Sequence, residues 1–139
     1  MKKLILISLF IPFAGKAGFN SVHKPSTNLV EVRSGDWPIN LEKESDNSYS
    51  LQFRDEQYMN VVVMDTLPFA DLSQLKYFEQ ALSVLKTGVN GDIAKFKDYS
   101  IKKVATKKDA IWYMLRFKWS LTNFQQPEAD IMINAIKNL

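Results

Sequence analysis

Residues 111–120, IWYMLRFKWS, alternate between two kinds of side chain, and this alternation constrains the fold more than any other feature of the chain. Successive side chains of a β-strand point to opposite faces of the sheet, so the stretch predicts a strand with one buried face. The face that we expect in the core consists of Ile111, Tyr113, Leu115, Phe117 and Trp119. The opposite face mixes aromatic, thioether, cationic and hydroxyl groups, on Trp112, Met114, Arg116, Lys118 and Ser120.

The rest of the chain supplies three further strands and two helices. Residues 99–106 form a strand that pairs with 111–120 across a polar turn, which makes one hairpin. Residues 49–54 and 58–64 form a second hairpin. If Tyr99 and Ile101 faced the core, Lys103 would point inward as well, so the pattern leaves the hairpin register open. One helix should begin after the N-cap Asp71 and end at Gly88, and a second should start at Pro127.

These elements predict an α+β fold in the order β-β-α-β-β-α. We expect an antiparallel sheet of about four to five strands, with two helices packed on one face. Residues 49–139 would form this single domain. Residues 18–48 are rich in turn formers and predict an irregular arm, with a possible edge strand at 28–33.

The first residues have the three parts of a secretory signal peptide. Lys2 and Lys3 precede the apolar run 4–13, and the small residues Gly15 and Ala17 follow it. The run is about half the ~20 residues that a membrane-spanning helix needs, so a signal peptide over 1–17 is favoured over an anchor. We therefore expect an exported protein of the bacterial periplasm or cell surface. Because the chain has no cysteine, a lipoprotein is not expected.

Removal of that segment would change the charge of the chain. The whole sequence has 18 basic and 15 acidic side chains, and residues 1–17 hold three of the basic ones and none of the acidic ones. The remaining chain would have 15 of each sign, so nucleic-acid binding by a generally basic domain is not favoured. Without cysteine no disulfide can stabilise the fold, which must depend on its core.

Residues suited to catalysis or to metal binding are scarce. His23 is the only histidine, and with no cysteine beside it we expect no metal and no cofactor. Carboxylates occur mainly where turns are expected, and the best candidates for an acid or base are Asp65 and Asp98.

Two surface features remain as candidate binding sites. The first is the mixed strand face of Trp112, Met114, Arg116 and Lys118, joined by Lys102 in one of the possible registers. The second is the lysine-rich turn with Lys107 and Lys108, which could attract anions or keep the sheet edge soluble.

The hypothesis that these observations favour is a small exported, non-enzymatic binding or accessory protein of the cell envelope. It would bind a protein, an envelope component or a ligand through an exposed sheet face and hairpin loops. One alternative is a carboxylate-dependent hydrolase of envelope glycans, which would use paired acids near aromatic platforms. Another is a salt-sensitive binder of anions or nucleic acid.

Overall fold

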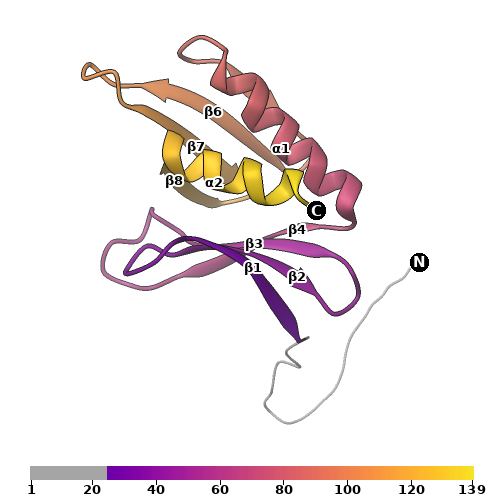
Figure 1. Ribbon diagram of the computed structural model, residues 1–139. Helices are drawn as coiled ribbons and strands as arrows, with labels where there is room; N and C mark the ends of the chain where they lie inside the picture. The colour runs from indigo at the N-terminus through magenta and orange to yellow at the C-terminus, as the bar shows by residue number, and fades with distance from the viewer. Residues whose placement is uncertain (1–24) are drawn as a thin grey trace.

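Two four-stranded antiparallel sheets and two helices make up residues 25–139, the part of the chain that the computed structural model describes (Figure 1). The expected signal peptide and His23 lie outside the described residues. The α+β class, the antiparallel pairing and the two helices are confirmed, although the structure has more strands than we predicted.

Each sheet is a meander in which the strands lie side by side in chain order, and a helix follows each sheet. The first unit consists of β1 (Ser26–Arg33), β2 (Ile39–Glu44), β3 (Tyr49–Arg54), β4 (Met64–Phe69) and α1 (Leu72–Lys86). The second unit consists of β5 (Ile93–Lys95), β6 (Tyr99–Ala105), β7 (Ile111–Phe117), β8 (Ser120–Gln125) and α2 (Gln126–Lys137). The element order is therefore β-β-β-β-α twice over.

Both helices begin where the sequence predicts. The carboxylate of Asp71 accepts a hydrogen bond from the main-chain N–H of Gln74 at 2.9 Å, which caps α1. At the start of α2, Pro127 lies in the first turn, and the Glu128 carboxylate accepts a hydrogen bond from the main-chain N–H of Gln125 at 2.8 Å. Local chemistry thus defines both helix starts.

Residues 26–44, within the expected irregular arm, form two strands. β1 covers the predicted edge strand and lies at the edge of its sheet. β2 was not predicted. Its Ile39 and Leu41 are fully buried opposite Phe53 and Leu51 of β3, because alternate residues of antiparallel partners share a face.

The hairpin predicted over 49–64 is wrong in its second half. The strand β4 starts only at Met64, and residues 58–62 lie exposed in the loop before it. The register explains the difference: Leu67 and Phe69 pair with Leu51 and Tyr49 of β3 and are buried, so they supply the apolar face. Pro68 is compatible with this strand because β4 lies at the sheet edge, where a missing N–H breaks no ladder.

The strand predicted over 111–120 ends three residues early, and the assignment of Trp119 to the core is wrong. Tyr113, Leu115 and Phe117 are buried as expected, but the backbone turns at Lys118, which has a φ of 54°, and β8 begins at Ser120. Trp119 lies in this turn and is 90% exposed. The alternation is confirmed as far as Phe117, but the turn takes Trp119, the last residue of the expected core face, out of the strand.

The register that sequence left open places Lys103 in the interior. Tyr99 pairs with Phe117 and Lys103 with Tyr113, so Lys103 faces the helices and is only 6% exposed. Its ammonium donates hydrogen bonds to the main-chain oxygens of Lys86 and Gly88, both at 2.8 Å. A buried cation is tolerated here because it satisfies the carbonyls at the end of α1.

The two helices lie next to each other on one face of the second sheet (Figure 1). This confirms the expectation that both helices pack on the same face of a sheet. α1 contacts β5 and β6 and also β4 of the first sheet, whereas α2 contacts β7, β8 and also β1 of the first sheet. Buried side chains of both sheets and both helices form one continuous core. The opposite face of the β5–β8 sheet is left free of helices.

Candidate interaction surface

Six exposed apolar side chains gather where the β3–β4 loop meets the turn between β7 and β8. Trp119 is 90% exposed and Met59 is 71% exposed, and the others are between 47% and 67% exposed. We call this set the apolar corner; it consists of Tyr58, Met59, Val61, Val62, Met64 and Trp119. It holds half of the twelve large apolar side chains that are exposed among residues 25–139, so these residues are concentrated and not scattered.

Hydrogen bonds at both ends of the loop join it to the turn. The side-chain amide of Gln57 donates to the main-chain oxygen of Trp119, and the hydroxyl of Ser120 donates to the carboxylate of Asp65. The exposed residues of the loop lie between these two links. Segments about sixty positions apart in the sequence therefore form one surface.

Two carboxylates at the start of the β3–β4 loop accept hydrogen bonds from residues of β8. Asp55 accepts from the main-chain N–H of Leu121 at 3.2 Å, and Glu56 accepts from the hydroxyl of Thr122 at 2.7 Å and the main-chain N–H of Asn123 at 2.8 Å. The main-chain N–H of Glu56 in turn donates to the oxygen of Leu121 at 2.7 Å. These bonds hold the loop of one sheet against a strand of the other.

Asp55 is almost completely buried, at 2% exposure. Burial raises the pKa of this carboxyl group, but hydrogen bonds from Gln57, Leu121 and Ser120 outweigh the burial, so the pKa lies below its ordinary value of 3.8. Asp55 is therefore ionised at neutral pH and serves as an anchor for the loop.

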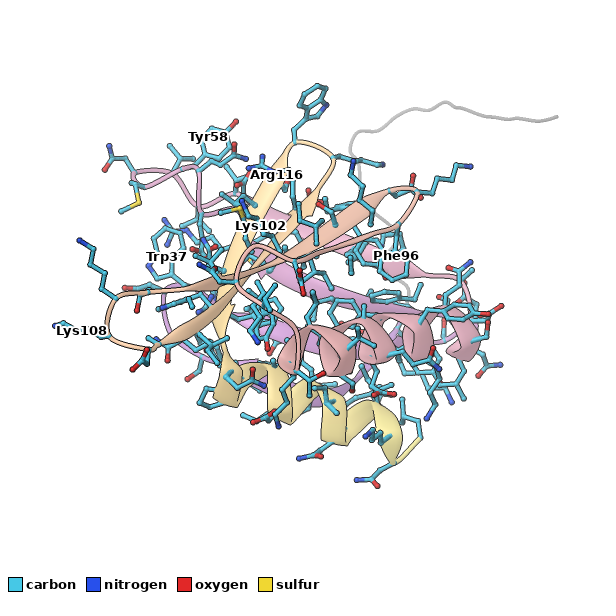
Figure 2. The ribbon with its side chains drawn as sticks, turned by 90° about the horizontal axis from the view of Figure 1, so that it is seen from above. Trp37, Tyr58, Phe96, Lys102, Lys108 and Arg116 are labelled. Carbon is cyan, nitrogen blue, oxygen red and sulfur yellow. The ribbon has the colours of Figure 1, made fainter. Side chains whose placement is uncertain are left out.

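The structure brings four of the seven predicted site residues onto one face of the β5–β8 sheet. No helix of the described residues packs on this face. Lys102 pairs with Met114, and Trp112 and Arg116 lie two residues away on either side of Met114 in β7. Figure 2 shows Lys102, Arg116 and Tyr58 on the side of the molecule opposite the two helices. The predicted strand face thus borders the apolar corner.

The other three predicted residues lie in turns. Lys118 is in the turn beside Trp119, and its ammonium lies 5.1 Å from the centre of the Phe117 ring. Lys107 and Lys108 lie in the turn between β6 and β7, at the other end of β7 (Figure 2). The two lysines are therefore not part of the surface around Arg116.

A groove of about 480 Å³ opens beside Met59. Besides Met59, it is lined by Trp37, Trp112, Arg33, Glu56, Ser34 and Asp36. Arg33 forms ion pairs with Glu56 at 3.3 Å and with Glu128 at 3.5 Å, so its charge is already balanced. The groove extends the apolar corner toward Trp112.

A second cavity, of about 300 Å³, lies between β4, α1 and the turn that precedes β6. Phe69, Phe96, Tyr99 and Phe117 line it, and the rings of Phe96 and Tyr99 stack 4.5 Å apart. Burial raises the pKa of the Tyr99 phenol well above its ordinary value, so this group is neutral at physiological pH. The cavity is mainly aromatic and apolar.

The two candidate catalytic acids, Asp65 and Asp98, lie in different environments. Asp65 accepts hydrogen bonds from Ser120 and from the main-chain N–H of Thr66, whereas Asp98 is exposed in the turn between β5 and β6. Residues 25–139 contain no group of three or more His, Cys, Asp or Glu side chains that could hold a metal ion. Within the same residues, neither helix is long and apolar enough to cross a membrane.

Sequence reasoning missed the apolar corner because it assigned both of its segments to strands. Apolar residues are expected inside, and the pattern does not separate a buried run from an exposed one. One sequence feature that argues against a continuous strand is Asn60, a turn-forming residue in the middle of the apolar run.

Comparisons with protein-family models, with curated proteins and with solved structures found no match to this chain.

Proposed function

We propose that this chain is a small non-enzymatic binding protein that attaches to its partner through the apolar corner. The observation that supports this most directly is the exposure of six large apolar side chains on two segments held together by the carboxylates of Asp55 and Glu56. Exposed apolar area is unfavourable in water, and concentrated patches of this kind mark interaction sites.

The polar groups near the corner support binding over catalysis. Asp55, Glu56 and Asp65 all accept hydrogen bonds that fix the loop, so their role in the fold is accounted for. The expected signal peptide over residues 1–17 further supports a place in the bacterial cell envelope, in the periplasm or at the cell surface.

Site-specific photo-crosslinking in the producing cells tests this proposal. A photoreactive amino acid is placed at Val62, in the corner, or at Val84, on α1; the two valines are 67% and 69% exposed. We expect a discrete adduct from position 62 and none of the same mass from position 84. Equal adduct patterns at both positions, or no adduct at position 62, would contradict the proposal.

A further inference from the structure

We infer that the partner of the apolar corner is the surface of a phospholipid bilayer that contains anionic lipids. This inference rests on the proposed function, in which the corner is a binding surface, and it names the chemistry of the partner. Three observations carry it: the residue types of the corner, its projecting shape and the charges around it.

The side chains of the corner are those that suit the boundary between lipid and water. Trp119 and Tyr58 combine a large ring with one polar group, and such rings are enriched at the level of the lipid headgroups. Met59, Val61 and Val62 have no polar group on their side chains and could enter the acyl region below. The corner therefore offers a boundary layer and an apolar tip.

The shape of the corner also suits a deformable surface. Its residues lie on a loop and a turn at one end of the molecule, and the 90% exposure of Trp119 means that this ring projects into solvent. A projecting side chain reaches into a bilayer directly, whereas a protein partner would need a matching pocket. No second element among the described residues covers the ring.

Most of the exposed charged side chains beside the corner are positive. Lys118 precedes Trp119, and Arg116 and Lys102 are exposed on the neighbouring sheet face. Of the corner's own acids, Asp55 is buried and Asp65 is half-buried, and Glu56 forms an ion pair with Arg33. Asp36, in the groove beside Met59, is an exposed acid nearby. Asp98 is exposed in the β5–β6 turn, next to Lys97. Cations placed this way attract anionic headgroups and orient the apolar tip toward the bilayer.

Hydrogen–deuterium exchange with lipid vesicles tests the inference in the whole chain. Two probes are used: vesicles of phosphatidylcholine alone, and vesicles of equal parts phosphatidylcholine and phosphatidylglycerol. We expect slower exchange in residues 58–64 and 118–120 when the anionic vesicles are present. Exchange at each segment is read locally, so lipid binding by the apolar run 4–13 cannot substitute for protection of the corner.

Matched variants separate the contribution of the apolar side chains to vesicle binding from the contribution of the cations. Trp119→Ser and Val62→Ser should each weaken binding to anionic vesicles on the order of tenfold, whereas Val84→Ser, an equally exposed valine on α1, should not. The pair Lys102→Gln and Arg116→Gln should also weaken it on the order of tenfold, and more than Lys107→Gln with Lys108→Gln.

The inference is overturned if the anionic vesicles leave exchange in 58–64 and 118–120 unchanged, or if Val62→Ser and Val84→Ser bind alike. If photo-crosslinking at position 62 then still gives a discrete protein adduct, the proposed function stands and its partner is a protein. If both experiments give nothing at the corner, the proposed function fails together with the inference.

Discussion

The carboxylate of Glu56 lies 2.8 Å from the main-chain nitrogen of Asn123 and accepts its hydrogen bond. The same carboxylate accepts from the side-chain amide of Asn123 at 3.1 Å and from the hydroxyl of Thr122. A single side chain thus connects the β3–β4 loop of the first sheet to β8 of the second. Together with the links made by Asp55, Gln57 and Asp65, this connection sets the relative position of the two segments of the apolar corner.

Replacing Glu56 by Ala should therefore loosen the corner while leaving its apolar residues in place. Three donors of β8 lose their acceptor, and hydrogen bonds to a charged group contribute about 1.5–3 kcal/mol each before the site relaxes. We expect the free energy of unfolding to fall by about 2 kcal/mol in chemical denaturation. The exposed Glu31→Ala serves as a control, and an equal loss in both variants would contradict this role.

The buried Asp55 predicts a pH dependence of stability. Hydrogen bonds lower its pKa in the folded state below 3.8, so the ionised form favours folding. This contribution is fully present above the unfolded pKa and is lost as the pH falls through the lower folded pKa. We expect Asp55→Asn to be less stable than the wild type at neutral pH and the difference to shrink as the pH falls below 3.8.

Urea unfolding of both proteins over that pH range measures the difference. Asp130 also has a lowered pKa and remains in both proteins, so its effect cancels in the comparison. A difference in stability that stays constant with pH would show that Asp55 acts through packing and not through its charge.

Lys103 should stabilise the end of α1, because its ammonium donates to the oxygens of Lys86 and Gly88. Lys103→Met keeps most of the side-chain volume but leaves these carbonyls without their donor, and we expect a loss of about 1–3 kcal/mol. Amide exchange should become faster near residues 86–88. Lys102→Met, the next residue on the exposed face, is the control, and equal effects of the two substitutions would contradict the prediction.

Lys103 also shows what sequence alone can resolve. The alternation around it predicted that it would point inward if Tyr99 and Ile101 did, and the structure has that register. A lysine buried without acceptors argues against the register, and the acceptors of Lys103 belong to another part of the chain, at the end of α1. Sequence patterns describe the faces of an element, whereas the partners of a buried polar group depend on tertiary packing.

The same distinction explains the candidate surface. Period-two alternation correctly placed Trp112, Met114 and Arg116 on one face, and the observed register adds Lys102. The pattern could not locate the end of the strand, which depends on the turn at Lys118. Nor could it show that residues 58–62 lie in a loop, because the burial of Leu67 and Phe69 decides which part of that region pairs with β3.

Trp119 allows a direct test of this correction. As a member of the core, it would cost about 3–5 kcal/mol when truncated, as large buried side chains do. At 90% exposure, Trp119→Ser should instead change the free energy of unfolding by no more than about 0.5 kcal/mol. Phe117→Ser, two residues earlier and 4% exposed, should be severely destabilising in the same denaturation experiment. Comparable losses in the two variants would mean that Trp119 is covered in solution, and the apolar corner would then lose its most exposed member.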